Sequence, residues 1–293
     1  MKIHFFPNIW ADTILLEKDG HFGLIDACIN MDELNAYFLK TGVKKLDFII
    51  LTHFHRDHYG SLDEVIRTYP VEQVIFKDYS GVDAWADNGL TADDEYRTNE
   101  MRICNELKDT IKKYSKLVMS NEVDELLWMG IPLKLFYTEN TMKYVFEDEN
   151  CSAYHKHCFS ENHNNMPIFF EYAGRNVLLS GDISDVKSKD ERFSFMNRRL
   201  ANKLNCKLDI YKAAHHGLVI GTPETLEIYK PNYAVITNDE INSADAVKRL
   251  IAANPAVNVF IMSNGGKVFE IFPNGEIVIT DLEGFKPSNP LMN

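Results

Sequence analysis

Along the first 80 residues, the spacing of hydrophobic and polar positions alternates between strand-like and helix-like patterns. Short apolar runs between turn residues predict strands, whereas apolar residues three or four positions apart predict helices. The chain signals one helix boundary clearly, with Asn30 as the N-cap and Gly42 near the C-terminal end. The expected strands are residues 13–17, 22–25, 46–51 and 71–76, and the expected helices are residues 31–40 and 61–68.

A longer helical pattern over residues 94–118 separates this region from a second series of strands and helices. Thr222 as N-cap and Pro223 at the first helical position open a further helix, and another is expected over residues 243–253. The strands expected here are residues 133–137, 144–147, 168–172, 176–179, 208–213, 233–237, 260–262, 267–272 and 276–280. The pattern predicts one layered α/β domain over residues 1–293, with a helical insertion near 91–128.

Composition narrows the functional classes. The chain has 293 residues, of which 45% are hydrophobic and 25% charged, as in ordinary globular proteins. Its net charge of −12 disfavours long duplex nucleic acid and anionic membranes as partners. No run approaches the roughly 18 apolar residues of a membrane-spanning helix. The five cysteines are odd in number and form no CxxC pair, which indicates a reducing, cytoplasmic setting.

The segment THFHRDH places three histidines and an aspartate within six residues, directly after an expected strand. In an extended stretch, residues i and i+2 point the same way, so His53 and His55 can hold one cation together. If the chain then turns, Asp57 and His58 face a second cation. Imidazole and carboxylate donors suit Zn²⁺, with Mn²⁺ or Fe as alternatives.

Two later segments place further donors at strand ends. Asp182 follows the apolar run LLSG, and His215 and His216 follow the apolar-rich segment LDIYKAA. Ligands of α/β proteins gather at the carboxyl ends of strands. These side chains are therefore candidates to join the donors of the THFHRDH segment.

These segments together resemble the motifs of the metallo-β-lactamase superfamily of metallohydrolases. THFHRDH matches its HxHxDH signature, GLID its early strand ending in an aspartate, LLSGD its metal-bridging aspartate and AAHHG its final histidine motif. The resemblance implies an α/β fold in which two mixed β-sheets pack face to face with helices on the outer faces. It also implies a pair of divalent metal ions, with Zn²⁺ as the expected metal, and a hydroxide between them as the nucleophile.

The resemblance assigns the residues as follows. One metal ion would be held by His53, His55 and His163, the other by Asp57, His58 and His216, and Asp182 would bridge them. The third histidine stays open, because His155 and His157 are alternatives to His163 and some relatives carry asparagine near this point. Asp26 and Thr52 would hydrogen-bond to the ligands.

The adjacent pair His215 and His216 leaves a further choice. Glycine typically follows the ligand in this family, which favours His216. His215 would then contact the substrate or orient a ligand, so Asp57 and His215 are the candidates for direct catalytic roles.

The motif set is most similar to the group containing DNA-uptake-channel hydrolase domains and phosphorylcholine esterases, which implies phosphodiester hydrolysis. Leu218 and Pro167 stand where the DNA-uptake relatives usually carry serine. Together with the acidic net charge, these departures favour a small phosphodiester over duplex DNA. The alternatives are hydrolysis of carboxylic esters or amides, as in lactonases, thioesterases and β-lactamases, and a non-catalytic metal-binding regulatory module.

Overall fold

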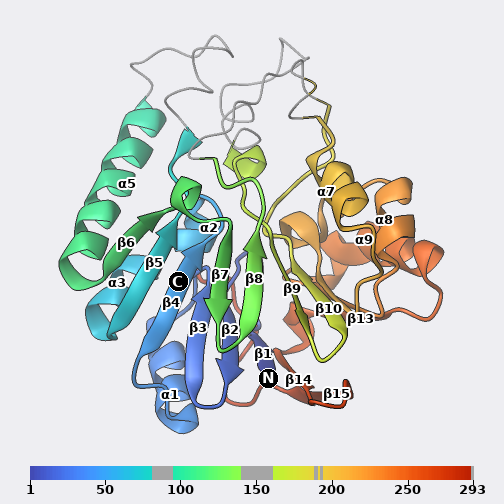
Figure 1. The fold of residues 1–293 in the computed structure, drawn as a ribbon, viewed down its shortest axis with the longest axis horizontal. Coiled ribbons are helices and arrows are strands. Elements are labelled where there is room, and N and C mark those ends of the chain that lie inside the picture. Colours follow the sequence, from blue (N-terminus) through green and yellow to red (C-terminus); the bar gives the residue numbers. More distant parts are fainter. Residues whose placement is uncertain (81–94, 140–160, 188–190, 192–193, 292–293) are drawn as a thin grey trace.

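Two mixed β-sheets form the centre of the computed structural model, which describes residues 1–80, 95–139, 161–187, 191 and 194–291 (Figure 1). Within these residues the first sheet has eight strands in the order β15-β14-β1-β2-β3-β4-β5-β6. Its strands are β1 (Lys2–Phe5), β2 (Ile14–Lys18), β3 (His21–Ile25), β4 (Leu46–Leu51), β5 (Val71–Phe76), β6 (Lys116–Met119), β14 (Lys267–Ile271) and β15 (Ile277–Asp281). Strands β3 to β6 run parallel.

The second sheet has seven strands among the described residues, in the order β13-β12-β11-β10-β9-β8-β7. Strands β10 to β13 run parallel, and the others pair antiparallel. The strands are β7 (Glu125–Trp128), β8 (Ile131–Leu135), β9 (Ile168–Tyr172), β10 (Arg175–Leu179), β11 (Ile210–Lys212), β12 (Tyr233–Ile236) and β13 (Asn258–Ile261).

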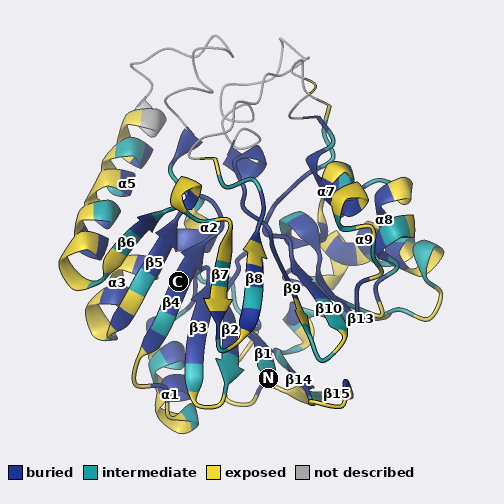
Figure 2. Ribbon diagram, in the orientation of Figure 1, coloured by how far each residue is buried: buried dark blue, intermediate teal, exposed yellow. Residues whose placement is uncertain are grey.

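Helices cover the outer face of each sheet. The helices on the first sheet are α1 (Met31–Thr41), α2 (Arg56–Tyr59), α3 (Leu62–Thr68) and α5 (Glu95–Tyr114), and those on the second are α7 (Met196–Leu204), α8 (Pro223–Tyr229) and α9 (Glu240–Ala253). One apolar core fills the space between the sheets, with Phe5 and Phe48 from the first and Phe170 and Val177 from the second. Figure 2 shows β3 and β4 largely buried and the outer helical faces exposed, whereas β7 is mostly exposed. The predicted αββα fold class is confirmed.

The boundaries differ from the sequence prediction at several places. The long helix ends at Tyr114, four residues early, because residues 116–119 form β6 and pair with β5. Helix α9 begins at Glu240 rather than at 243, with Asp239 accepting a hydrogen bond from the Asn242 backbone. Helix α3 begins at Leu62, one residue later than expected, and the hydroxyl of the N-cap residue Ser61 donates to the Ile29 carbonyl oxygen instead of capping the helix. Strands β1 and β7 and helix α7 were not predicted, and the strand expected over 144–147 lies outside the described residues.

The carboxyl ends of the parallel strands β3, β4, β10, β11 and β12 all precede polar side chains. Asp26, the THFHRDH segment, Asp182, the His215–His216 pair and Thr237 follow these strands in turn. The fold therefore gathers the predicted donors at one edge of the two sheets. Within the described residues, no helix has both the length and the apolar character needed to cross a membrane.

Candidate metal centre

The THFHRDH segment leaves β4 as a short extended loop and then enters α2. His55 stands in an extended conformation as the N-cap of α2, and Asp57 and His58 lie within that helix. The rings of His53 and His55 meet, with His53 Nε2 3.1 Å from His55 Nδ1. The structure thus brings the first two histidines together and places the aspartate and third histidine one turn further on.

The second sheet supplies the remaining donors. Because β10 and β11 run parallel as neighbours, the turns after them lie side by side. The backbone N–H of His215 donates to the carbonyl oxygen of Gly181 at 3.0 Å, which ties the two turns together. Asp182 and His216 are each 1% exposed. Both therefore face inward toward the THFHRDH segment.

Among the described residues, three groups of potential ligand atoms lie close together. Besides the group of Asp12, Asp26 and His58, there are two groups that share Asp182. One contains Asp57, His58, Asp182 and His216, and the other contains His53, His55 and Asp182; within each group the donor atoms lie within 4.8 Å of one another. The Nε2 atoms of His58 and His216 are each 3.4 Å from an Asp182 carboxylate oxygen, and His53 Nε2 is 3.9 Å away. Asp182 thus stands between the two groups.

Not every predicted ligand belongs to these groups. His163 is 1% exposed, but the described residues place it beside Ser184 Oγ, 3.2 Å from Nε2, and outside both groups. His155 and His157 lie outside the described residues. His215 Nε2 is 3.9 Å from Asp182, and the amide of Asn162 lies 3.3 Å from that same nitrogen.

Asp26 and Thr52 lie directly behind the histidines. His58 Nδ1–H donates to Asp26 at 2.7 Å, and both the backbone N–H and the hydroxyl of Thr52 donate to the same carboxylate at 2.8 Å. Thr52 Oγ1 also lies 3.1 Å from His53 Nδ1. Because Nδ1 of His58 is bonded to Asp26, its Nε2 is the nitrogen turned toward Asp182.

Three residues in this centre were missed by the sequence reasoning. Asp12 and Lys212 are buried and ion-paired, and Lys212 Nζ also lies 3.1 Å from the Gly181 carbonyl and 3.6 Å from Asp182. Thr237 accepts from His216 Nδ1 at 2.9 Å and donates to Asp12 at 2.7 Å. Thr237 is the last residue of the expected strand 233–237, a position that could have identified it; Asp12 carries no local signal.

The electrostatics of the centre favour positive charge. Burial is the largest single effect and opposes protonation of His58 and His216, but the surrounding carboxylates, Asp182 first among them, together outweigh it and raise the pKa of both imidazoles well above its usual range. Burial lowers the pKa of His55 to about 4, so this ring is neutral at pH 7. Burial also opposes ionisation of Asp182, but the imidazoles hold its pKa well below the usual range.

The donor set fits divalent metal ions. Within the described residues, both carboxylate oxygens of Asp182 and the Nε2 atom of His58 are buried without a hydrogen bond. Buried polar atoms without a hydrogen-bond partner are costly unless a ligand or ion satisfies them. Imidazole nitrogens and carboxylate oxygens are the donors that zinc and other transition metals take. We conclude that both groups can bind such ions.

The turns that carry Asp182 and His216 have unusual backbone conformations. Gly181 has φ 53°, and a Cβ added there would lie 2.1 Å from the side-chain oxygen of Asn165. That amide accepts from the Asp182 backbone N–H at 3.1 Å and donates to the Ser180 carbonyl at 2.8 Å. His215 and His216 have φ 51° and 50°, a region that non-glycine residues rarely adopt. Strain of this kind is concentrated at functional sites.

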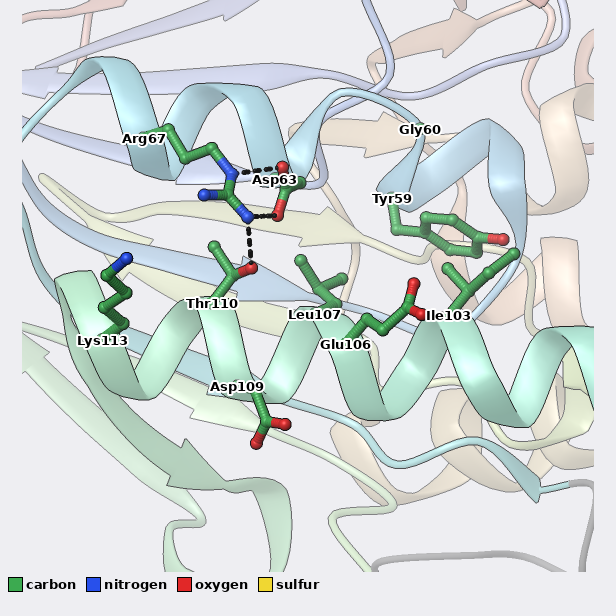
Figure 3. Close-up of a pocket in the computed structure, with 10 residues that line it drawn as sticks. All are labelled: Tyr59, Gly60, Asp63, Arg67, Ile103, Glu106, Leu107, Asp109, Thr110 and Lys113. Carbon is green, nitrogen blue, oxygen red and sulfur yellow. Dashed lines mark hydrogen bonds and ion pairs between the residues drawn. The ribbon is translucent and has the colours of Figure 1, made fainter.

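A surface cavity of about 570 Å³ lies between α3 and α5 (Figure 3). None of the donors of the metal centre lines it. Two of its charged side chains, Arg67 and Asp63, form an ion pair at 2.6 Å, and Arg67 also donates to the Thr110 hydroxyl. The lining residues are Tyr59, Gly60, Asp63, Arg67, Ile103, Glu106, Leu107, Asp109, Thr110 and Lys113.

Comparison with known proteins points to one family. The sequence profile described as "Metallo-beta-lactamase superfamily" matches residues 11–140, which include the THFHRDH segment. This match supports membership of that superfamily.

The curated relatives match over shorter stretches. Over 96 residues, or 32% of this chain, the sequence is 30% identical to the uncharacterized protein YobT of Bacillus subtilis. Over 60 residues, or 20% of the chain, it is 38% identical to the anti-Pycsar protein Apyc1 of Saccharibacillus brassicae. The matches span 41% and 24% of the length of these relatives.

Among solved structures, the metallo-beta-lactamase fold protein YhfI from Bacillus subtilis is similar. It has a TM-score of 0.49 and 10% sequence identity, over 95% of this chain and 99% of that one.

Proposed function

We propose that this protein is a dinuclear metal-dependent hydrolase of the metallo-β-lactamase superfamily that acts on small phosphodiesters. The observation that carries the proposal is the sharing of buried Asp182 by two adjacent donor groups. When bound, the two metal ions would activate water and polarise the substrate, which suits phosphodiester hydrolysis at neutral pH.

The protein residues would divide the remaining work. Asp57, His58 and His216 would hold one ion, His53 and His55 the other, and Asp182 both. We also propose His163 as a donor to the second ion, because a hydrogen bond to Ser184 needs only one of its two ring nitrogens. Asp26 and Thr52 would fix the orientation of the imidazoles through the hydrogen bonds described above.

We assign substrate contact to His215. Its side chain is 20% exposed, whereas that of the neighbouring ligand Asp182 is 1% exposed, so His215 lies between the buried donors and solvent. The Asn162 amide donates to His215 Nε2, which leaves the proton of a neutral ring on Nδ1. Among the described residues that Nδ1 has no hydrogen-bond partner. We expect the Nδ1–H group of His215 to donate a hydrogen bond to a substrate oxygen.

A small substrate is favoured over a long nucleic acid. The net charge of −12 repels a polyanion. Leu218, two residues beyond His216, is 41% exposed and presents an apolar surface at this turn. Such a surface would contact an organic substituent better than a phosphate backbone. Carboxylic esters and amides are the alternative substrate class.

We also propose that residues 1–293 act as one catalytic domain in the cytoplasm. The support for this location is the state of the described cysteines, since Cys28, Cys104 and Cys206 are all free thiols. Free thiols persist where the surroundings are reducing. Fractionation of cells that express the protein would test the location.

The test of the function is hydrolysis of bis(p-nitrophenyl) phosphate with added Zn²⁺ or Mn²⁺. Asp57→Asn and Asp182→Asn should each abolish turnover, because each removes a charged ligand. Asp245→Asn is the matched control, since Asp245 lies on α9 with its side chain 81% exposed. It should keep full activity.

Two outcomes would revise the proposal. Two bound ions without phosphodiester turnover would redirect the search to lactones, thioesters and β-lactams. Failure to bind any metal would leave a non-catalytic module as the better description.

A further inference from the structure

A buried carboxylate lies behind the metal centre without belonging to either of its donor groups. Glu161 is 0% exposed. Among the described residues, neither of the groups that share Asp182 includes it. Taking a carboxylate out of water is costly unless hydrogen bonds or a cation compensate. The groups that contact Glu161 are hydrogen-bond donors, so its role follows from the segments to which these donors belong.

Four hydrogen bonds from three segments of the chain converge on this carboxylate. Its Oε1 atom accepts from the backbone N–H of Phe54 at 2.9 Å and from the Asn164 amide at 3.2 Å. Its Oε2 atom accepts from the backbone N–H of Ser80 at 2.9 Å and from the hydroxyl of the same residue. The two oxygens of an ionised carboxylate can accept about four such bonds. Glu161 therefore uses its full capacity to join the loops after β4 and β5 to its own segment.

The bond to Phe54 matters most for the metal centre, because Phe54 lies between the first two histidines of THFHRDH. This loop lies beyond the end of β4, so pairing within the sheet does not fix it. On the other side of His53, the carbonyl oxygen of Thr52 accepts from the backbone N–H of Met166 at 2.9 Å. The segment from Glu161 to Met166 thus holds the backbone on both sides of His53.

The same carboxylate places the two residues that follow it in the chain. Asn162 and His163 are 2% and 1% exposed. The Asn162 amide lies 3.3 Å from Nε2 of His215, the proposed substrate contact, and His163 is the proposed further donor. Because Glu161 is bonded to the loop after β4, it sets where both side chains stand relative to that loop.

We propose that Glu161 is a positioning residue of the metal centre. It is not itself a ligand; its carboxylate holds the loop of His53 and His55 and the turn of Asn162 and His163 in the arrangement that accepts metal. The proposal rests on the proposed function in that the centre binds metal. A glutamine in this place has one acceptor oxygen instead of two and would face the same donors with an amide. The metal affinity should then fall about 10–100-fold, the usual effect of losing a group that orients metal ligands.

The experiment compares two buried glutamates. Glu161→Gln alters the carboxylate bonded to the ligand loop, whereas Glu100→Gln alters one that is 7% exposed and accepts from the side chain of Tyr59 at 3.0 Å. Each full chain is titrated with Co²⁺ without substrate, and the visible absorption of the bound ion reports the geometry of its ligands. We expect an altered spectrum and the weakened affinity in Glu161→Gln. Glu100→Gln should keep the wild-type spectrum and affinity, even where thermal unfolding shows a loss of stability.

Hydrogen exchange in the wild type adds a measurement that needs no variant. Phe54 is 0% exposed, and its backbone N–H is bonded to Glu161 in the absence of metal. In metal-free protein this amide should therefore exchange slowly, as amides in stable regions do. Exchange at the rate of an exposed amide would overturn the proposal, even if Glu161→Gln fails to fold.

The cobalt titration can overturn the proposal in two further ways. A folded Glu161→Gln with the wild-type spectrum and affinity would remove the positioning role. Equal changes in Glu100→Gln would show only a general loss of stability. Hydrolysis of bis(p-nitrophenyl) phosphate is measured separately, so a wild type that binds cobalt without turnover rejects the proposed function alone. A wild type that binds no cobalt rejects both proposals.

Discussion

Lys77 and Lys212 are both fully buried, and each stands at the carboxyl end of a parallel strand, one in each sheet. Lys77 follows β5 and donates to the backbone carbonyls of Tyr137 and Glu139. Lys212 ends β11 and meets the Asp12 carboxylate, with Asp182 3.6 Å away. The same side chain, at the same depth, thus stabilises peptide carbonyls in one region and carboxylates in the other.

The pKa values of Lys77 and Lys212 are shifted in opposite directions. Burial lowers the pKa of Lys77 to about 8, because nearby carboxylates compensate only in part. Burial also acts on Lys212, but Asp12 and Asp182 outweigh it and raise its pKa. Burial alone therefore does not decide whether a lysine is charged. The carboxylates within reach decide it.

The largest difference should come from removing each ammonium group. In metal-free protein, Lys212→Met removes the ion-pair partner of the buried Asp12 carboxylate, and breaking a buried ion pair in this way costs about 3–5 kcal/mol. Lys77→Met strands only two carbonyls, at about 1–3 kcal/mol. Urea unfolding of both variants measures this. Equal losses of unfolding free energy in the two variants would mean that the Asp12–Lys212 ion pair stabilises the protein no more than the hydrogen bonds of Lys77 do.

The pH dependence of stability tests Lys77 directly. Folded Lys77 releases its proton at about pH 8, whereas the unfolded chain holds it up to the ordinary value of 10.5. The unfolded state then binds more protons in this window, so the free energy of unfolding should rise with pH, by at most about 3 kcal/mol. Lys212 has a raised pKa, so it contributes nothing to this rise, and its stabilisation is lost only above 10.5.

Urea unfolding of the metal-free protein at several pH values between 8 and 10.5 would measure the slope. Lys77→Met should flatten it. A slope that survives in this variant would assign the effect to another group.

A smaller change should follow from cutting the link between the Lys212 pair and the metal centre. Thr237→Val removes the hydroxyl that joins Asp12 to His216. We expect metal affinity to fall by about 10–100-fold, the usual effect of losing such a hydrogen bond. The free energy of unfolding should fall by no more than about 1–3 kcal/mol, the cost of leaving buried polar groups without a partner. Metal titration by calorimetry measures the affinity. Unchanged affinity would show that His216 is held by packing alone.

Lys45 provides the reference for a lysine outside the core. Its side chain is 52% exposed and pairs with the exposed carboxylate of Glu72 at 2.6 Å. Solvent screens such pairs, so Lys45→Met should leave urea unfolding and metal binding unchanged within error. A clear loss of stability in Lys45→Met would contradict the view that burial separates Lys77 and Lys212 from lysines on the surface.

The sequence could predict one half of the centre better than the other. The donors of THFHRDH are close because they are neighbours in the chain, so local spacing suffices. Asp182 and His216 were candidates because each follows an apolar run, but their approach to THFHRDH depends on the parallel pairing of β10 and β11, which the local pattern does not predict. The αββα layers followed from the family resemblance, since the apolar pattern alone missed β1 and ran one helix into β6.

The remaining parts of the centre could not be predicted because tertiary contacts create them. Lys77 and Lys212 occupy similar positions at the ends of apolar strands, and nothing nearby in sequence shows which one meets carboxylates. Asp12 is 200 residues from Lys212 in the sequence, as their numbers show. His163 matched the expected spacing before a strand, yet the structure places it beside Ser184 instead of in either donor group.

The position of β1 between β2 and β14 bears on how the protein folds. Lys2 pairs with Glu270, so the strand that precedes Asp12 completes its hydrogen bonds only with the last hairpin of the described chain. Contacts between residues so far apart in sequence slow folding. During synthesis on the ribosome, one side of β1 therefore has no strand partner until β14 has been made. Removing β14 and β15 would leave β1 as a permanent edge strand, available for pairing with other molecules.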